Sequence, residues 1–391
     1  MGTDVKGKRL RTIQLIESLE AGGAENLAVE IANELAARGH ESHLVVLQSD
    51  GPFQSRVSSN VQLHSLDVAP AIGNLFSRAY KFFKAVRSLR RVISLTGANV
   101  VQTHLPKANF LGLTCALTCN CRVFPTVHNN REFDYGNDSG PLKTSLRKRA
   151  YRQMLTSCAS MIAVSEAVRI GMMSELQIKD GEAQGIRVVN NGVRVPELAT
   201  DVEKRSSRLG RGLTLDDFVI VAVGRLVYQK DFLSLVRALA RANEDLPPWK
   251  CLIAGEGELR GSIEKEIEVL GLSDRISLVG IEKDVSDILR TADVFCIPSR
   301  YEGLPLVMLE AMAAGIPVCA FSIDGISEIL TEGKEGMLAQ PQDIDRMAEL
   351  LVEMAGNPVE RRAMGEAARS LVIDGYDFDR VVSELEEIYS L

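Results

Sequence analysis

The sequence lacks a hydrophobic run that could cross a bilayer. Its longest stretch without a charged residue, residues 108–121, falls short of the roughly 20 apolar residues that a membrane-spanning helix needs. No apolar signal segment precedes the first strand that we expect, which begins near residue 12. These absences argue against a protein held by membrane-spanning helices, and we expect a cytoplasmic protein.

Paired cysteines are also missing. The chain has seven cysteines but no Cys-x-x-Cys motif, and several of them lie in apolar, strand-like segments. Buried thiols of this kind are typical of a reducing compartment and do not indicate a disulfide framework. Cys115, Cys119, Cys121 and His128 could in principle hold a zinc ion, but without a paired motif we predict no metal site.

Acidic residues are absent from residues 68–131, where nine basic residues occur. Residues 1–195 contain 24 Lys and Arg against 16 Asp and Glu, whereas the remaining residues contain 21 against 36. The net charge of −7 therefore combines a first half of +8 with a second half of −15. A basic half of this kind commonly faces phosphate, in a nucleic acid or at an anionic membrane surface.

The length of 391 residues is too great for one ordinary hydrophobic core and suits two domains. An apolar fraction of 46% and a charged fraction of 25% are typical of a soluble globular protein. Short β-branched runs alternate with amphipathic segments, which is the pattern of a parallel sheet covered by helices on both faces. The sequence therefore predicts an α/β protein with two doubly wound, Rossmann-like domains.

The expected first domain covers residues 1–195 and the second covers residues 197–391, with a linker at about 190–196 where turn-forming residues interrupt the pattern. Ligands of open parallel sheets bind beyond the carboxyl ends of the strands, so we expect a site in a cleft between two facing sheets. Residues 361–391 look helical with a break at Gly375 and Tyr376, and the last helix could cross back to the first domain. The expected strands are residues 12–16, 43–47, 100–103, 123–127, 161–164 and 186–189, and then 219–223, 250–254, 276–279, 294–297 and 317–320.

The strongest motif spans residues 299–318 and directly follows an expected strand. Gly303 lets the backbone approach a ligand, and Pro305 suits the first position of a helix, whose N-terminus favours a diphosphate. Glu302 and Glu310 would lie before and inside this helix, where carboxylates can accept hydrogen bonds from sugar hydroxyls. Either Glu alone could be a plain surface residue, and only the whole segment indicates a site.

A second motif, residues 221–231, also follows an expected strand. Arg225 and Lys230 in this loop could pair with both phosphates of a leaving diphosphate and neutralise the charge that grows as a glycosidic bond breaks. These side chains would then replace a metal ion. The alternative is that both residues are solvated surface charges.

Weaker signals lie in the first half. Gly22 and Gly23 follow the first expected strand and form a turn through which main-chain N–H groups could approach a phosphate or a sugar. His104 and His128 lie at the ends of two further strands, and a neutral histidine can donate to or accept from a sugar hydroxyl. Each of these residues could also be merely structural.

Three apparent motifs are set aside. Residues 255–258 begin like a dinucleotide-binding loop, but Arg260 stands where the third glycine belongs. Residues 343–345 and 377–379 resemble an Asp-x-Asp metal motif, yet both lie in expected helices near the C-terminus. We interpret these carboxylates as surface charges.

From about residue 10 to residue 375 the sequence resembles the family 4 retaining glycosyltransferases, which have the GT-B fold of two Rossmann-like domains facing across a cleft. The segments that carry this resemblance most specifically are residues 224–230 and 302–318. Looser matches are residues 22–25, 126–128 and 191–193.

The resemblance implies that Arg225 and Lys230 bind the donor diphosphate and that Glu310 binds its ribose. Glu302 and His128 would contact the transferred sugar, and no catalytic metal would be needed. The second domain would bind the donor, and the first would face the acceptor. The remaining donor-binding residues would be Gly22, Gly23, Gly224, Gly303 and Leu304, with His104 as a candidate on the acceptor side.

Such an enzyme would move a sugar from a nucleotide-diphosphate sugar, most commonly a UDP-sugar in this family, to a glycan or lipid-linked acceptor with retention of configuration. The implied context is cell-surface polysaccharide or glycolipid synthesis, with no cofactor besides the nucleotide sugar and no nucleic-acid partner. The alternatives are a sugar-nucleotide epimerase or a phosphorylase of the same fold, or an inactive binding subunit. Residues 324–328 depart from the Gly-Gly-x-Pro-Glu of many members, which bears on the shape of the donor-sugar pocket.

A basic helix is expected at residues 75–93, inside the acid-free stretch. At 100° per residue, Phe76 and Phe83 fall on the same side as Leu89 and Ile93, and most basic residues fall on the other side. One interpretation is a surface helix packed on the first sheet. The other is a helix that lies on an anionic membrane, at the inner face of the plasma membrane. The membrane-facing candidates are Arg78, Lys81, Lys84 and Arg87.

Overall fold

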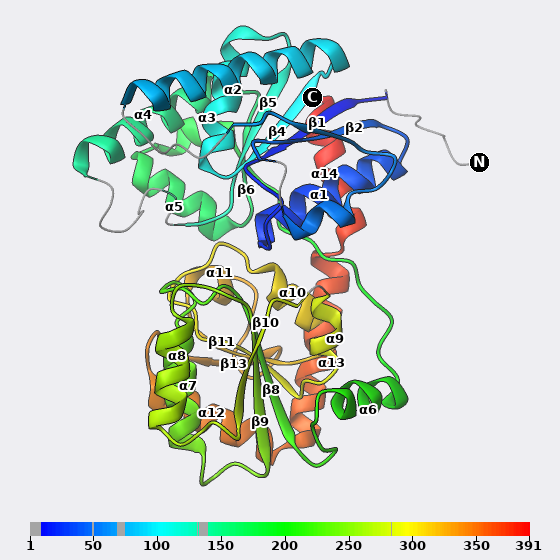
Figure 1. Ribbon diagram of the computed structural model, residues 1–391, viewed down its shortest axis with the longest axis vertical. Helices are drawn as coiled ribbons and strands as arrows, with labels where there is room; N and C mark the ends of the chain where they lie inside the picture. The colour runs from blue at the N-terminus through cyan, green and yellow to red at the C-terminus, as the bar shows by residue number, and fades with distance from the viewer. Residues whose placement is uncertain (1–8, 49–50, 69–74, 131, 133–139, 283) are drawn as a thin grey trace. The chain divides into compact units, whose positions relative to one another are not determined.

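The computed structural model describes residues 9–391 except 49–50, 69–74, 131, 133–139 and 283, and it divides into two compact units (Figure 1). The first unit is the chain up to Asn190 together with Val381–Leu391, and the second unit is Asn191–Arg380. Each unit contains one parallel β-sheet with its own helices. The predicted α/β class with two Rossmann-like domains is confirmed.

The first unit contains a seven-stranded sheet in the order β3-β2-β1-β4-β5-β6-β7, in which all paired strands are parallel. The chain order reverses between β1 and β4, and sheets of this kind bind ligands beyond the carboxyl ends of the strands at such a point. Its strands are β1 (Arg11–Ile16), β2 (Glu41–Val46), β3 (Gln62–Ser65), β4 (Val100–His104), β5 (Arg122–Val127), β6 (Met161–Ala163) and β7 (Ile186–Val188). Its helices are α1 (Gly23–Ala37), α2 (Leu75–Thr96), α3 (Pro106–Thr118), α4 (Pro141–Ser157) and α5 (Glu166–Leu176), with short 3-10 helices at Pro52–Arg56 and Asp180–Gly185.

The second unit contains a six-stranded sheet in the order β10-β9-β8-β11-β12-β13, again with parallel pairs. Here the order reverses between β8 and β11, the strands that precede the two strongest sequence motifs. Its strands are β8 (Phe218–Val223), β9 (Trp249–Ala254), β10 (Ile276–Gly280), β11 (Val294–Ile297), β12 (Val318–Phe321) and β13 (Gly336–Ala339). Its helices are α6 (Asp201–Gly210), α7 (Phe232–Ala242), α8 (Arg260–Val269), α9 (Val285–Leu289), α10 (Leu306–Ala313), α11 (Asp324–Ser327), α12 (Ile344–Gly356) and α13 (Pro358–Gly375), and α14 (Phe378–Ser390) begins in this unit.

Alternating side chains of the first sheet build two cores. Ile13 and Leu15 of β1 belong to a buried cluster with Leu89 of α2, whereas Ile16 belongs to a second cluster with Val29 of α1. Successive residues of a strand point to opposite faces, so a buried strand with apolar residues on both sides needs helices over both faces. This explains why the near-continuous apolar runs predicted the strands well.

Two strands at the sheet edges were not predicted from the sequence. β3 contains the polar residues Gln62 and His64, and β13 begins at Gly336. The edge strand β3 is covered less than a central strand and therefore needs fewer apolar residues. β13 is apolar and mostly buried, but it is only four residues long. Gly336 also permits close packing, because a Cβ at this position would lie 2.2 Å from the carbonyl oxygen of Val318.

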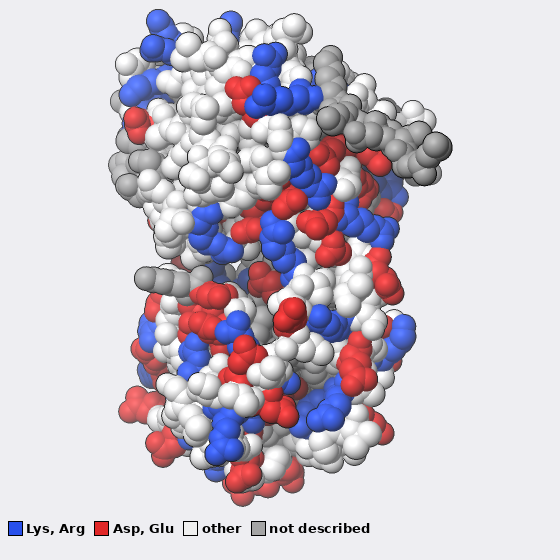
Figure 2. All heavy atoms as spheres, turned by 90° about the vertical axis from the view of Figure 1, so that its right-hand side faces the viewer, with Lys and Arg blue, Asp and Glu red and all other residues white. Residues whose placement is uncertain are grey.

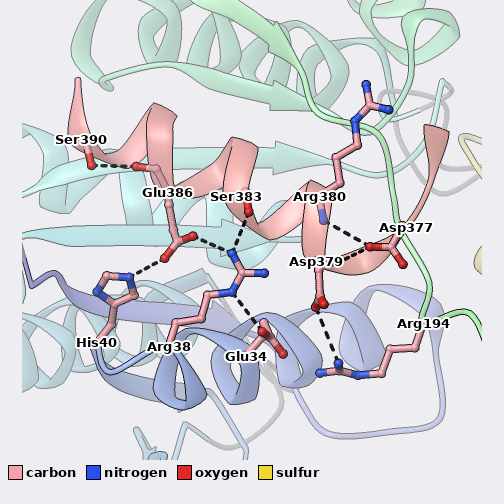
Figure 3. Close-up of polar contacts among 10 residues, drawn as sticks. All are labelled: Glu34, Arg38, His40, Arg194, Asp377, Asp379, Arg380, Ser383, Glu386 and Ser390. Atoms are coloured by element: carbon pink, nitrogen blue, oxygen red, sulfur yellow. Dashed lines mark hydrogen bonds and ion pairs between the residues drawn. The ribbon is translucent and has the colours of Figure 1, made fainter. Parts of the chain in front are cut away.

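The final helix packs in the first unit from Val381 onward. The predicted break at Gly375 and Tyr376 is confirmed, since α13 ends at Gly375 and α14 begins at Phe378. Glu386 of α14 lies with one carboxylate oxygen 2.6 Å from His40 Nε2, and it accepts a hydrogen bond of 2.7 Å from Arg38 Nη1 (Figure 3). These contacts and buried apolar side chains anchor the C-terminal residues on the first sheet.

The prediction that one apolar side of the basic helix packs on the first sheet is wrong for the first half of α2. Leu89 and Ile93 of α2 are buried in the core, but Phe76, Tyr80 and Phe83 are 85%, 69% and 64% exposed. The buried face instead includes Ala85, and apolar residues of the earlier turns lie outside it because only the later turns pack against the sheet. The outward face of α2 therefore combines aromatic rings with charges.

The negative charge of the second unit does not form one continuous surface on the face drawn in Figure 2. Acidic and basic side chains are interspersed over that unit. Several of the acidic residues form ion pairs, for example Asp293 with Arg208 at 2.7 Å and Glu282 with Arg211 at 2.6 Å.

Candidate active site

Two loops meet at the carboxyl ends of β8 and β11 in the second unit. The backbone carbonyl of Gln229, in the loop after β8, accepts a 2.8 Å hydrogen bond from the backbone N–H of Arg300, in the loop after β11. The side-chain amide of Gln229 donates to the carbonyl of Tyr301 at 3.0 Å. Because β8 and β11 are neighbours at the point where the strand order reverses, the two strongest sequence motifs lie in contact.

A buried carboxylate forms the centre of this contact. Glu302 is 6% exposed, and its Oε1 lies 2.5 Å from Lys230 Nζ and accepts a 2.7 Å hydrogen bond from the Ser299 hydroxyl. Gln229 Nε2 lies 3.4 Å from the other carboxylate oxygen. A buried carboxylate needs such partners because an uncompensated charge in the interior is costly. Ser299 and Gln229 were not singled out from the sequence, although both lie within the quoted motifs.

The loop after β8 is held close to the loop after β9. The backbone N–H of Leu226 donates to the carbonyl of Glu256 at 2.8 Å. A Cβ on Gly255, whose φ is +140°, would lie 1.9 Å from the carbonyl oxygen of Gly224, and one on Gly257 would lie 2.4 Å from that of Leu226. Only glycine permits this approach. Gly255 and Gly257 therefore allow the loop after β9 to support the Arg225 loop.

Two further residues hold the loop that contains Glu302 and Leu304. The buried side chain of Asn191 donates a 2.8 Å hydrogen bond to the carbonyl of Leu304. A Cβ on Gly325 would lie 2.0 Å from the carbonyl oxygen of Gly303. Gly325 belongs to the segment that departs from the usual family pattern, and the structure gives it a packing role against this loop.

The helix that follows the loop is α10. It begins at Leu306, with Pro305 as its N-cap residue at φ −71° and ψ 113°, so the predicted helix start at Pro305 is wrong by one residue. Such a shift is small, because the N-cap residue is only half inside the helix. Glu310 is the fifth residue of α10 and is partly buried.

Arg225 differs from Lys230 in its surroundings. Its side chain is exposed, whereas that of Lys230 is 17% exposed and paired with Glu302. Among the residues that the structure describes, no acidic side chain pairs with the Arg225 guanidinium. This charge is therefore available to an anionic ligand.

In the first unit, the predicted glycine turn forms the start of α1. Gly22 is the N-cap residue and Gly23 is the first helical residue, and Asn26 N–H donates to the Gly22 carbonyl at 2.9 Å. Glu25 lies in the first turn, where a carboxylate interacts favourably with the helix dipole. A Cβ on Gly22 would lie 2.2 Å from the Glu25 carboxylate, so a side chain at Gly22 would force Glu25 to move.

The two histidines at the strand ends lie together in the first unit. His104 Nδ1 lies 3.1 Å from His128 Nε2, and His104 Nε2 lies 2.8 Å from the Oε1 atom of Gln14. Burial lowers the pKa of His104 well below its ordinary value, and burial lowers the pKa of His128 to about 4. Both rings are therefore neutral at neutral pH, and a neutral imidazole can donate to or accept from a hydroxyl.

Other ionisable groups near these strand ends were missed in the sequence. Lys107 Nζ lies 2.6 Å from a carboxylate oxygen of Glu17, which follows β1. Glu132 is 5% exposed and accepts a 2.5 Å hydrogen bond from the Tyr151 hydroxyl. Burial raises the pKa of Glu132 to about 7, against the opposing effects of that hydrogen bond and the charge of Arg147. Nothing in the local sequence signals that Glu132 is buried.

The described residues contain no group of three or more His, Cys, Asp or Glu side chains that could hold a metal ion. Burial raises the pKa of the Cys121 thiol to about 11 and that of Cys158 to about 12, so these thiols stay protonated. Asp343 is the N-cap residue of α12, and Asp377 accepts a hydrogen bond from the backbone N–H of Asp379 at the start of α14. Asp345 and Asp379 are 74% and 69% exposed, which agrees with their interpretation as surface charges. Over the described part of the chain, no helix combines the length and apolar character needed to cross a membrane.

The chain matches two protein-family models that meet near the boundary between the two units. Residues 21–195 match the model described as Glycosyltransferase Family 4, and residues 204–371 match the model described as Glycosyl transferases group 1. A relative from Escherichia coli, named UDP-Gal:alpha-D-GlcNAc-diphosphoundecaprenol alpha-1,3-galactosyltransferase, is 26% identical over 79% of this chain and 79% of its own length. The N-acetyl-alpha-D-glucosaminyl L-malate synthase of Bacillus anthracis is 23% identical over 94% of this chain and 93% of its own.

Solved structures share the fold. The Anabaena protein HepE, determined in complex with UDP and glucose, superposes with a TM-score of 0.81 at 19% identity, over 97% of this chain and 99% of that one. The sucrose-phosphate synthase of Thermosynechococcus elongatus gives a TM-score of 0.82 at 20% identity, over 97% and 98% of the two chains.

Proposed function

We propose that this chain, which belongs to the family 4 glycosyltransferases of the GT-B fold, transfers a sugar from a UDP-sugar to a glycan or lipid-linked acceptor with retention of the anomeric configuration. The observation that carries the proposal is the contact between Lys230 and Glu302 at the carboxyl ends of β8 and β11. A cation and a carboxylate side by side suit a ligand that joins a diphosphate to a hydroxyl-bearing sugar.

In this proposal each residue of the second unit has a distinct task. Arg225 and Lys230 bind the diphosphate, and they stabilise the charge that develops on it as the bond to the sugar breaks. Glu302 accepts hydrogen bonds from the sugar that moves, and Glu310 accepts them from the ribose. Gly224, Gly303 and Leu304 bring the backbone close to the ligand. The positive side chains take the role of a metal ion, so the reaction needs none.

The first unit supplies the remaining contacts. His128 bonds a hydroxyl of the transferred sugar, with His104 beside it as a candidate on the acceptor side. Gly22 and Gly23 at the start of α1 allow main-chain N–H groups to approach the donor. The UDP in the HepE complex and the undecaprenol-linked acceptor in the name of the Escherichia coli relative support this choice of substrates.

We also propose that the outward face of α2 lies on an anionic membrane. Phe76, Tyr80 and Phe83 are exposed on this face together with Lys84 and Arg87, and rings interspersed with cations suit the boundary between headgroups and acyl chains. Lys81, another candidate, is half-buried, and the side chain of Arg78 lies outside the described part of the structure. A lipid-linked acceptor would then be presented at the surface to which the protein binds.

The test is transfer of label from radiolabelled nucleotide sugars to a crude polyprenyl-linked or glycan acceptor fraction, with the stereochemistry of the product determined by NMR. The proposal expects label from one UDP-sugar to move to the acceptor with the anomeric configuration unchanged. Conversion of the free nucleotide sugar without an acceptor would indicate an epimerase. Formation of a sugar phosphate would indicate a phosphorylase, and binding without turnover would indicate an inactive subunit.

A further inference from the structure

A buried chain of polar side chains leads from the last helix to His128 within the first unit. The Tyr389 hydroxyl of α14 donates to the side-chain oxygen of Gln102 and accepts from Gln14 Nε2, which lies 3.4 Å away. Gln14 Oε1 lies 2.8 Å from His104 Nε2, and His104 Nδ1 lies 3.1 Å from His128 Nε2. Tyr389, Gln14, Gln102 and His104 are all 0 to 1% exposed, so water does not substitute for these contacts.

The register of the sheet sets up this chain. Gln14 of β1 lies directly opposite Gln102 of β4, and His104 lies opposite Thr126 of β5. Residues two apart on a strand share a face, so Gln102 and His104 point to the same side of the sheet. The ring of Tyr389 also packs against Phe124 of β5, with centroids 5.2 Å apart. The side chains therefore meet because the strands are parallel neighbours and α14 covers them.

The hydrogen bonds of the chain run in one direction. Gln14 uses its amide nitrogen as donor to Tyr389, so its oxygen faces His104, and a carbonyl oxygen can only accept. The proton of the neutral His104 ring must then be on Nε2, which leaves Nδ1 as an acceptor. His128 must therefore donate from its Nε2, and in its neutral ring Nδ1 carries no proton. Gln102 Nε2 completes the pattern by donating to the Thr126 hydroxyl at 2.8 Å.

We propose that Tyr389 is a positioning residue which, through Gln14 and His104, holds His128 in the tautomer whose Nδ1 accepts a hydrogen bond from a substrate hydroxyl. The proposal rests on the proposed function for the identity of that substrate as a sugar. Tyr389 sets the orientation of Gln14 because its hydroxyl has a single proton and can donate it to only one of the two glutamines. With that proton on Gln102, Gln14 must donate toward Tyr389 and accept from His104.

The tautomer restricts the ligand group at His128. An unprotonated Nδ1 accepts a hydrogen bond from a hydroxyl or an amide N–H, but it repels a carboxylate or phosphate oxygen, which has no proton to donate. The ring also stays uncharged at neutral pH, because burial lowers the pKa of His128 to about 4. The group of the substrate that faces His128 is therefore a neutral hydrogen-bond donor, such as a hydroxyl of the sugar, and not a carboxylate or phosphate oxygen.

The test measures the tautomer directly, without substrate. The protein contains five histidines, so long-range 1H–15N spectra of the full chain labelled with 15N-histidine at pH 7.5 resolve each ring. We expect His104 and His128 to be protonated on Nε2 only. In Tyr389→Phe the two glutamines lose the group that orients them, and both rings should shift toward mixed tautomers. Gln14→Leu, which cuts the chain between Tyr389 and His104, should have the same effect on both rings.

The matched control is Tyr151→Phe, which removes another buried hydroxyl from the same unit. The Tyr151 hydroxyl bonds Glu132 and lies 3.4 Å from Asn109 Nδ2. Neither partner belongs to the series of hydrogen bonds from Tyr389 to His128, so the loss of this hydroxyl should leave both tautomers unchanged. The NMR signals of His40 show whether α14 keeps its position, because His40 contacts Glu386 of that helix. Its signals should stay fixed in Tyr389→Phe, and a change in His40 of the same size would overturn the assignment to the hydroxyl.

Protonation of His128 on Nδ1 in the wild type would contradict the proposed direction of the hydrogen bonds. Unchanged tautomers of both rings in Tyr389→Phe would contradict the proposed role of Tyr389. Kinetics are measured with the UDP-sugar that the transfer assay identifies. In Tyr389→Phe, kcat/KM should fall about 2- to 10-fold, which corresponds to the loss of one ordinary hydrogen bond. In Tyr151→Phe, kcat/KM should stay at the wild-type value. A protein with the expected tautomers but no transferase activity would reject the proposed function and leave this inference standing.

Discussion

Lys230 and Glu302 are 72 residues apart in the sequence, yet Nζ of the lysine lies 2.5 Å from Oε1 of the glutamate. The pair is mostly shielded from water, with side chains 17% and 7% exposed. Each charge stabilises the other, and Ser299 gives the carboxylate a second partner. In the absence of a ligand, the pair keeps both side chains in place at the carboxyl ends of β8 and β11.

Replacement of Lys230 or Arg225 with Ala should lower kcat/KM by about 100-fold or more, because each variant loses a charged contact to the leaving diphosphate. Steady-state kinetics with the preferred UDP-sugar measure the loss. Lys265→Ala, which removes an exposed lysine of α8, is the control and should keep full activity. Normal turnover by a folded Lys230→Ala protein would reject the diphosphate role.

Glu310→Ala should raise the donor KM with little change in kcat, because a ribose contact is about equally strong in the ground and transition states. Glu302→Ala should lower kcat as well, since it would contact the sugar that moves. The removal of Glu302 also leaves Lys230 without its partner, so melting temperatures must be compared first. If Glu302→Ala and Glu310→Ala both retain wild-type kinetics, neither carboxylate binds the donor.

Transfer should continue in EDTA, because Arg225 and Lys230 supply the positive charge that a metal ion would otherwise provide. The measurement is initial rate before and after dialysis against the chelator, with magnesium or manganese added back. Loss of activity that either ion restores would contradict this mechanism.

Wild-type protein should sediment with liposomes that contain anionic lipid at low salt, and high salt should release it. Each basic residue near such a surface contributes about 1 kcal/mol, so Lys84→Gln with Arg87→Gln should weaken binding clearly. Replacement of the exposed aromatic residues with Ser should also weaken membrane binding, but at all salt concentrations; these residues are Phe76, Tyr80 and Phe83. The control is Lys204→Gln with Arg205→Gln on exposed α6, which removes the same charge elsewhere. Equal binding by all variants would reject α2 as the membrane surface.

Glu132→Gln should stabilise the first unit at pH 8 but not at pH 4. Burial raises the pKa of Glu132 to about 7 from 4.5, so the folded state holds a proton that the unfolded state has lost between these values. The wild type is therefore most stable relative to the variant below pH 4.5, and it loses about 3 kcal/mol as the pH rises through 7. Gln keeps an acceptor for the Tyr151 hydroxyl. Thermal unfolding of both proteins from pH 4 to 8 measures the difference, and parallel curves would contradict a buried, protonated Glu132.

The α/β class and the approximate place of most strands could be predicted before the structure, because apolar runs and their spacing are local properties of the chain. It also located Arg225, Lys230, Glu302 and Glu310 as candidates, since strand ends and helix starts leave local signals. All four residues lie within residues 204–371, which match the model described as Glycosyl transferases group 1.

Features that depend on partners far apart in the chain became visible only in the folded protein. The edge strand β3 forms by pairing with β2 and needs little apolar sequence of its own, and β13, only four residues long, forms by pairing with β12. The outward direction of Phe76 and Phe83 depends on which turns of α2 reach the core, which helical periodicity does not tell. The link from Tyr389 to His128 requires the register of β1 against β4 and the packing of α14 over both. Hydrogen bonds of this kind depend on distance in space, and a single sequence specifies only distance along the chain.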